Sequence, residues 1–203
     1  QPPRVVWPDS PSVYSGIRAY VDQVVVIDTT AGEIRVLMRP DAAPNTVWNF
    51  RGLAEGGFYT DVIFHRVVAK LPNGNPFVIQ VGDPTGTGMG GPGYYIDLEK
   101  STLPHDFGVI SMARSGDLNS GGSQVFLCLS REGTSFLDGN YTSFGQTIAG
   151  ADVITAIAAT PVGAQDRPVN PPAIKSARLV DAPPYGDPAR EPVSAPTAAP
   201  KER

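Results

Sequence analysis

The residues best suited to chemistry in this chain are an arginine and a glutamine set among apolar side chains. Arg66 lies between Phe64 and Val67, and Gln80 follows an apolar run that begins at Phe77. Apolar neighbours of this kind predict half-buried strands, whose few polar positions serve a purpose. A lone strand arginine most often forms a structural ion pair. A permanent cation and a neutral amide otherwise offer hydrogen-bond donors to a ligand, without a nucleophile.

Three later segments carry further polar and aromatic residues in a recognisable order. They are Ser111-Met112-Ala113-Arg114-Ser115, Gly122-Ser123-Gln124-Val125-Phe126 and Phe136-Leu137-Asp138-Gly139-Asn140-Tyr141. Together with F-H-R at 64–66 and F-V-I-Q-V-G-D at 77–83, they resemble the motifs of the cyclophilin family of peptidyl-prolyl cis-trans isomerases. Each motif alone is weak, but their order and spacing make a strong match over residues 20–181. Phenylalanine at 136 and tyrosine at 141 resemble bacterial members.

The resemblance implies a site and a role for each of its residues. Catalytic roles fall on Arg66, Gln80 and Phe126. Substrate contacts fall on ten further residues, namely Phe77, Val78, Gly86, Ala113, Arg114, Ser115, Gln124, Phe136, Leu137 and Tyr141. The family binds its ligands on the outer face of its barrel, so these residues are expected in a surface groove.

The implied reaction is rotation about the peptide bond that precedes a proline, in peptides and unfolded proteins. Rotation breaks the C–N resonance of the amide, a barrier of about 18 to 20 kcal/mol. By resemblance, Arg66 donates a hydrogen bond to the proline nitrogen of the twisted amide. Such a mechanism needs no cofactor and no metal. The alternatives are a proline-peptide-binding chaperone module with little turnover, and a scaffold that binds partners through proline-rich tails.

The family also binds the drug cyclosporin in this groove. Its best-known members have a tryptophan where this chain has Phe136, and the indole N–H donates to the drug. Phenylalanine keeps the apolar area and lacks that donor, so the sequence predicts cyclosporin binding with reduced affinity.

Other kinds of site fit the sequence less well. The string G-x-G-x-x-G at 86–91 is followed by Pro92 and Gly93, and a dinucleotide site needs a helix there. The chain has two histidines, His65 and His105, and neither is spaced for zinc. A Ser/His/Asp hydrolase is disfavoured because no G-x-S-x-G motif occurs, although triads are recognised by geometry.

Two of the remaining reactive side chains have structural interpretations. His65 is expected to be packed and hydrogen-bonded. Cys128 lies in an apolar strand and is expected to be a small buried hydrophobe with no special reactivity.

The elements that must position the site are mostly short strands. A hairpin is predicted from 20–28 and 32–38, with further strands at 62–68, 77–81, 108–112, 124–129, 143–148 and 174–180. Helical spacing with flanking Pro44 and Gly56 predicts a helix at 43–55, and a second is expected at 151–158. Strands of this kind favour an antiparallel barrel or a sandwich. The resemblance favours a mainly β fold, a closed eight-stranded antiparallel cyclophilin-like barrel capped by two helices.

Length and charge set the remaining expectations. The chain has 203 residues, a formal charge of −4 and one cysteine. We expect one isomerase domain at 20–181, a Pro-rich arm at 1–19 and a Pro/Ala-rich tail at 182–203. Neither nucleic-acid binding nor a membrane span is expected. The protein is expected to be a monomer. A start without methionine fits an exported protein, periplasmic or extracellular, and a trimmed cytoplasmic protein would look the same.

Overall fold

The computed structural model describes residues 22–196, and the predicted arm at 1–19 lies outside that range. Eight strands form one antiparallel sheet in the order β3-β4-β6-β5-β7-β2-β1-β8. The strands are β1 Gln23–Thr29, β2 Gly32–Met38, β3 Arg66–Val68, β4 Val78–Val81, β5 Val109–Met112, β6 Val125–Cys128, β7 Ser143–Ala149 and β8 Ile174–Asp181. The helices are α1 Pro44–Glu55, α2 Arg131–Thr134 and α3 Ala151–Ala158, with 3-10 turns η1 Ser135–Leu137, η2 Ala164–Asp166 and η3 Pro188–Arg190.

The first two strands form the predicted hairpin. Val24 pairs with Leu37, and the pairing continues to Thr29 and Gly32 at the turn. The Thr29 hydroxyl donates to the carbonyl of Gly32 and accepts from the amide of Ala31, which closes the turn. Gly32 has φ +134, and a Cβ there would overlap the side chain of Val153 in α3. A glycine is therefore required where the hairpin meets the helix.

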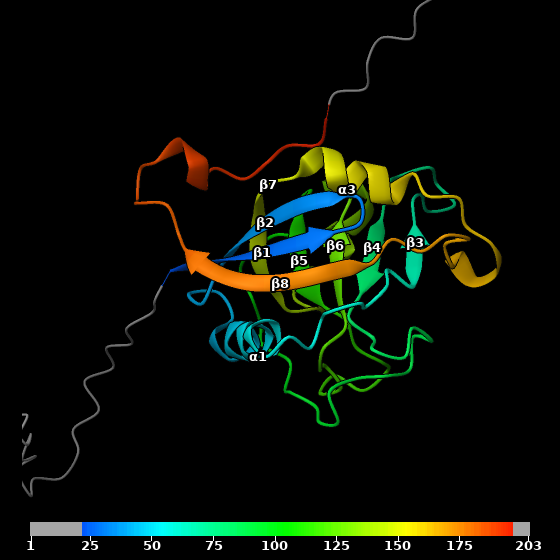
Figure 1. Ribbon diagram of the computed structural model, residues 1–203, viewed down its shortest axis with the longest axis horizontal. Helices are drawn as coiled ribbons and strands as arrows, with labels where there is room; N and C mark the ends of the chain where they lie inside the picture. The colour runs from blue at the N-terminus through cyan, green and yellow to red at the C-terminus, as the bar shows by residue number, and fades with distance from the viewer. Residues whose placement is uncertain (1–21, 197–203) are drawn as a thin grey trace, which may run out of the picture.

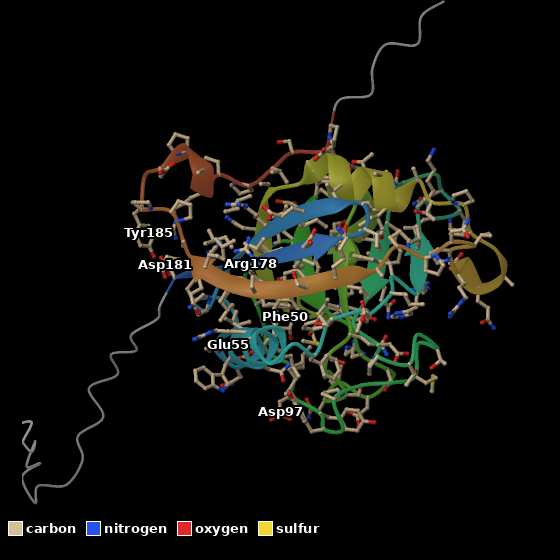
Figure 2. The ribbon with its side chains drawn as sticks, in the orientation of Figure 1. Phe50, Glu55, Asp97, Arg178, Asp181 and Tyr185 are labelled. Carbon is tan, nitrogen blue, oxygen red and sulfur yellow. The ribbon has the colours of Figure 1, made fainter. Side chains whose placement is uncertain are left out.

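The sheet curls around one hydrophobic core, and α1 and α3 lie on opposite sides of it (Figure 1). Alternate strand residues point inward, which follows from the two-residue period of a strand. Figure 2 shows Phe50 between α1 and β8, where its ring packs on Tyr59 and Phe144 at centroid distances of 5.1 Å. Ile154 and Ile157 bring α3 into the same core. Both predicted helices are thus confirmed, with their apolar faces against the sheet.

Helix α1 has an unusual N-terminal cap. Its N-cap residue, Ala43, makes no side-chain hydrogen bond. The carboxylate of Glu99, far along the chain, accepts from the backbone amides of Asn45 at 3.0 Å and Thr46 at 2.7 Å. A carboxylate suits this place because the first amides of a helix have no partner within it. The long loop before β5 is therefore anchored to α1.

The expected closed barrel is observed only as a curled, open sheet. Strands β3 and β8 are the two ends of the sheet order, and no ladder between them is formed by the described residues. The segments that precede them do meet. Ile63 and Ala173 form an isolated bridge, Phe64 donates to the carbonyl of Pro172 at 2.8 Å, and Ile174 donates to that of Val62 at 2.9 Å. The predicted strand at 62–68 is therefore split into a bridge and the short β3.

Residues 182–193 of the predicted tail are tied to the rest of the domain by a few specific contacts. Arg190 donates to Asp22 at 3.0 Å and to the carbonyl of Pro183 at 2.7 Å. The amide of Val193 donates to the carbonyl of Thr147 in β7 at 2.9 Å. Figure 2 places Tyr185 just beyond the end of β8, and its ring packs under the Arg190 guanidinium. We call residues 182–193 the C-terminal strap.

Candidate active site

Three neighbouring strands align the three predicted catalytic residues. Arg66 on β3 is the direct cross-strand partner of Gln80 on β4, and Gln80 is the partner of Phe126 on β6. Their strand neighbours Ile79 and Leu127 point into the core. Side chains alternate along a strand, so Arg66, Gln80 and Phe126 form a row on the outer face. We call these three residues the groove row.

The polar end of the groove row belongs to a chain of amide hydrogen bonds. Arg66 Nη1 donates to Gln80 Oε1 at 3.4 Å, a long bond, and Gln80 Nε2 donates to Gln124 Oε1 at 2.9 Å. Gln124 Nε2 then donates to the carbonyls of Gly88 and Gly90, both at 2.9 Å. This chain of hydrogen bonds links Arg66 to residues 86–91, which we call the glycine-rich loop, through the side chains of Gln80 and Gln124, and it restricts the rotation of both.

The other end of the groove row is apolar. Phe126 is only 5% exposed and packs with Val78, Leu137 and the half-buried Phe77 in a cluster separate from the barrel core. Its ring also meets that of Tyr141 edge-on at 5.7 Å. The predicted substrate residues Phe77, Val78, Ala113, Leu137 and Tyr141 therefore surround the predicted catalytic Phe126. A largely buried apolar cluster with half-buried side chains at its rim, beside fixed donors, suits a proline ring next to a peptide backbone.

Phe136 lies at the rim of this cluster. Its ring stacks on that of Phe77, with 5.8 Å between centroids and 16° between planes. The side chain is 58% exposed, so its outer edge faces solvent. Phe136 therefore extends the apolar wall outward and leaves room for a larger ring at its position.

A cavity of about 340 Å³ adjoins Gln80. Its lining includes four of the predicted substrate residues, Ala113, Arg114, Ser115 and Gln124, together with Met89 of the glycine-rich loop and Tyr95 beyond it. The Arg114 guanidinium packs over the Tyr141 ring and donates to the carbonyl of Asn140, so Arg114 lies between the cavity and the apolar cluster around Phe126.

The structure places Gly86 differently from the expectation for the glycine-rich loop. Gly88, Gly90 and Gly91 line the cavity, whereas Gly86 is buried against Ile63 and accepts a hydrogen bond from Arg167. The sequence could not separate these glycines, because the string G-x-G-x-x-G does not reveal which face of the turn each one takes.

A carboxylate beneath the loop holds its shape. Asp83 is fully buried and accepts from the amides of Thr85 and Gly88 and from the Thr85 hydroxyl. Desolvation raises the pKa of this carboxyl, but the hydrogen bonds from Thr85, Gly90 and Gly88 outweigh it and hold the pKa well below its ordinary value. Asp83 is thus an ionised anchor for the loop that lines the cavity, a role that was not predicted from the sequence.

Behind Phe126 the structure contains a Ser-His-Asp arrangement. His105 Nδ1 lies 2.8 Å from Asp138 Oδ1, and its Nε2 lies 2.9 Å from the hydroxyl of Ser111. Both Ser111 and His105 are 0% exposed, so no substrate can reach this hydroxyl. The histidine ring is roughly parallel to that of Phe126, with 6.1 Å between centroids. The arrangement supports the apolar pocket from behind and does not support a hydrolase.

The environments of His105 and His65 favour neutral rings. Burial lowers the pKa of His105 below its ordinary value, and the hydrogen bond to Asp138 opposes this only in part. Burial likewise lowers the pKa of His65. His65 is packed as expected, but the expected hydrogen bond is not formed, because neither of its ring nitrogens has a partner.

Cys128 is confirmed as a buried hydrophobe. It is fully buried in the apolar cluster around Phe126, and burial raises the pKa of its thiol far above the ordinary value. Among residues 22–196, no group of three or more His, Cys, Asp or Glu side chains could hold a metal ion. No helix in the same range is both long and apolar enough to cross a membrane.

Comparison with known proteins identifies the family. The family model for cyclophilin type peptidyl-prolyl cis-trans isomerase/CLD matches residues 24–179. A protein named peptidyl-prolyl cis-trans isomerase-like 2 from Rhizopus delemar is 44% identical over 147 residues, which are 70% of this chain and 26% of that longer protein. The peptidyl-prolyl cis-trans isomerase of the bacterium Synechococcus elongatus is 46% identical over 122 residues, 60% of this chain and 78% of that protein.

A solved structure shares the fold. The cyclophilin type isomerase of Cryptosporidium parvum, crystallised in the presence of the dipeptide Ala-Pro, has a TM-score of 0.71 and 32% identity, covering 78% of this chain and 99% of that one. The fold and the groove row thus define a curled, antiparallel β-sheet that carries a row of polar and aromatic side chains on its outer face. The chain belongs to the cyclophilin family of peptidyl-prolyl cis-trans isomerases. The resemblance in sequence is confirmed, and the alternative of a binding module with little turnover is not favoured.

Proposed function

We propose that the groove row is the catalytic centre of this isomerase, with Arg66 as the group that stabilises the twisted amide. The observation that supports it most directly is the cross-strand alignment of Arg66, Gln80 and Phe126 on one outer face. A substrate proline held on Phe126 would have its nitrogen beside Gln80 and within reach of the guanidinium. No bond of the substrate has to break, so binding the twisted amide more tightly than the planar forms is sufficient for catalysis.

The electronic reason concerns the proline nitrogen. In the planar amide its lone pair is delocalised into the carbonyl and accepts no hydrogen bond. As the amide rotates, the lone pair localises on nitrogen, and the Arg66 guanidinium can donate to it. A charge-assisted hydrogen bond is worth roughly 1.5 to 3 kcal/mol, which corresponds to about one to two decades of rate. The interaction exists only in the transition state, so it raises the rate without tightening substrate binding.

The remaining site residues would fix one half of the substrate and leave the other half free to rotate. The apolar cluster of Phe77, Phe126 and Leu137 would fix the proline ring while the preceding residue rotates. Gln80 would bind the backbone of the substrate, and the backbone of Arg114 would pair with the residues before proline. The Arg114 side chain is already bonded to Asn140 and Ser115, which supports a role for its main chain in this contact.

The proposed substrates are exposed X-Pro bonds of peptides and unfolded proteins, bound by a monomer. The solved relative crystallised with Ala-Pro supports a proline peptide as the minimal ligand. Cyclosporin would occupy the same apolar cluster with reduced affinity, because Phe136 offers no N–H donor at the rim. Export, an isomerase domain at 20–181 to which the C-terminal strap is attached, and a barrel closed through residues 61–64 and 172–174 are proposals of the same kind.

Exchange spectroscopy by NMR on an Ala-Pro peptide tests the function. The wild-type protein at substoichiometric concentration should bring cis/trans exchange from tens of seconds to less than about one second. A binding module would shift the peptide resonances while the exchange rate stays at its uncatalysed value. That second result would refute the proposal.

A further inference from the structure

The Arg66 guanidinium has a second neighbour that the groove row does not include. Arg66 Nε lies 3.6 Å from Oδ2 of Asp166, and the two side chains are 42% and 47% exposed. Among residues 22–196, Asp166 is the carboxylate that lies within ion-pair distance of Arg66. It comes from η2, in the connection between α3 and β8, far from the groove strands in sequence.

The backbone around Asp166 is in an unfavourable conformation. Gln165 has φ 60 and ψ 30, and Asp166 has φ 59, so two consecutive residues other than glycine are left-handed. Left-handed backbone is disfavoured for residues that carry a Cβ, and it persists where surrounding contacts enforce it. Such outliers cluster at functional sites, which points to a functional role for the contact between Asp166 and Arg66.

The contacts that enforce this conformation run back to the groove. Gly163 donates to the carbonyl of Arg167 at 2.8 Å, which closes the loop on itself, and Val169 donates to that of Pro161 at 2.9 Å. The Arg167 guanidinium then donates to the carbonyl of Gly86, in the glycine-rich loop. The residue directly after Asp166 is therefore fixed to the loop that follows β4, and this fixes Asp166 beside Arg66.

We infer that Asp166 is a positioning residue for Arg66, held by a strained loop that Arg167 fastens to the site. The inference rests on the proposed role of Arg66. A half-exposed arginine with four rotatable side-chain bonds samples many conformers unless contacts select one. The bond from Nη1 to Gln80 is long at 3.4 Å and would select weakly. Asp166 adds an opposite charge 3.6 Å from Nε, and this attraction depends less on hydrogen-bond geometry than the contact with the neutral Gln80 does. It acts at a different nitrogen of the planar group and leaves Nη2 for the substrate.

The exposure of the Arg66–Asp166 ion pair determines whether its loss changes the stability of the fold or the rate of the reaction. Half-exposed ion pairs contribute little to the free energy of unfolding. Misplacement of a catalytic donor, by contrast, acts directly on the barrier. Loss of Asp166 should therefore appear in the rate constant and not in thermal stability.

Two glycine variants separate the carboxylate from the backbone. Asp166→Gly removes the carboxylate and allows the left-handed conformation, and Gln165→Gly makes the same backbone change one residue earlier and keeps the carboxylate. We expect Asp166→Gly to lower kcat on an Ala-Pro peptide about three- to tenfold, with KM changed less than about twofold. Gln165→Gly should keep the wild-type kcat, and both should melt at or above the wild-type temperature. Equal kcat for Asp166→Gly and wild type, or equal losses for the two variants, would overturn the inference.

A double-mutant cycle and one spectroscopic signal test whether Asp166 acts through Arg66. In an Arg66→Ala background, Asp166→Gly should change the residual rate less than about twofold. The NMR order parameter of the Arg66 Nε–H bond should fall in Asp166→Gly and stay at the wild-type value in Gln165→Gly. A full additional loss in the Arg66→Ala background would contradict positioning. If Arg66→Ala is itself as active as wild type, the proposed catalytic role fails, whereas a slow Arg66→Ala with a fast Asp166→Gly refutes the positioning alone.

Discussion

At the scale of single residues, the groove combines one permanent cation, two linked amides and an apolar wall. Arg66, Gln80 and Phe126 are aligned because they are cross-strand partners, so their spacing is set by the ladder and not by flexible loops. Phe136 is the least constrained part of the wall, since it is 58% exposed and packs on one ring, Phe77. The family difference at this position should therefore change ligand preference more than turnover.

Phe136→Trp should tighten inhibition by cyclosporin about two- to tenfold, with kcat/KM on an Ala-Pro peptide changed less than twofold. The indole adds one N–H donor, and a neutral hydrogen bond contributes about 0.5 to 1.5 kcal/mol. Titration of the drug against both proteins in the same peptide assay measures the effect, and Phe136→Leu controls for loss of the ring. Identical inhibition of wild type and Phe136→Trp would show that Phe136 does not occupy the drug-contacting position.

The motifs of the groove residues are local to single strands, so the sequence could name these residues. The structure brings Arg66, Gln80 and Phe126 together as cross-strand partners, and their catalytic roles stay predictions. The misplaced Gly86, the unpaired His65 and the roles of His105, Asp83 and Asp166 depend on segments that meet only in the folded chain. Asp166 in particular approaches Arg66 through a turn whose left-handed backbone conformation no sequence pattern predicts.

At the scale of elements, the glycine-rich loop is organised by the buried carboxylate of Asp83. Its amide and hydroxyl donors favour the ionised form, so its folded pKa lies below the pKa of an unfolded chain. A group of this kind contributes stability that is fully present above the unfolded pKa of about 4 and is lost as the pH falls toward the folded value. The loop should therefore be most sensitive to acid below about pH 4.

Asp83→Asn should lower the free energy of unfolding at pH 7 by about 2 to 4 kcal/mol. The amide group would point its own N–H donors toward donors of Thr85 or Gly88, and each buried donor left unpaired costs about 1 to 3 kcal/mol. Urea denaturation at several pH values measures both this loss and its pH dependence. The variant should lose less further stability than wild type between pH 4 and pH 2, with the exposed Asp97→Asn as the control. Parallel pH profiles for wild type and Asp83→Asn would contradict the anchoring role.

Strand periodicity predicted the elements better than it predicted their closure. The hairpin and both longer helices lie within a few residues of their expected ranges. The strand expected at 62–68 is broken, because residues 61–64 turn to meet 172–174 while β3 pairs with β4. Whether two sheet edges meet depends on the curl of the whole sheet, which no single segment encodes.

At the scale of the whole molecule, the C-terminal strap extends the domain beyond the region matched by the family model. The ion pair of Arg190 with Asp22 has side chains only 15% and 25% exposed, the most buried arginine pair among the described residues. The strap contacts β7 and the start of β1 and touches none of the groove-row residues. It should therefore stabilise the fold without changing catalysis.

Arg190→Met should lower the free energy of unfolding by about 1 to 3 kcal/mol and leave kcat/KM unchanged. The substitution keeps an apolar stem and removes two hydrogen bonds and a partly buried charge pair. Thermal unfolding should show a lower Tm than wild type, by roughly 2 to 4 °C for each kcal/mol. Arg178→Met is the control, because the ion pair of Arg178 on β8 with Glu33 on β2 is longer, at 3.6 Å, and more exposed to solvent. Equal Tm values for the two variants would mean that the strap does not hold the fold.

If Arg66 stabilises the twisted amide, the rate of cis/trans exchange should differ among wild type, Arg66→Ala and Arg66→Lys. On an Ala-Pro peptide followed by NMR, Arg66→Ala should lose more than tenfold in kcat/KM, equal to more than about 1.4 kcal/mol of transition-state stabilisation. Arg66→Lys keeps a charge without the planar fork and should lose less. Circular dichroism and Tm should match wild type in both variants. A wild-type rate in a folded Arg66→Ala protein would show that Arg66 does not stabilise the twisted amide.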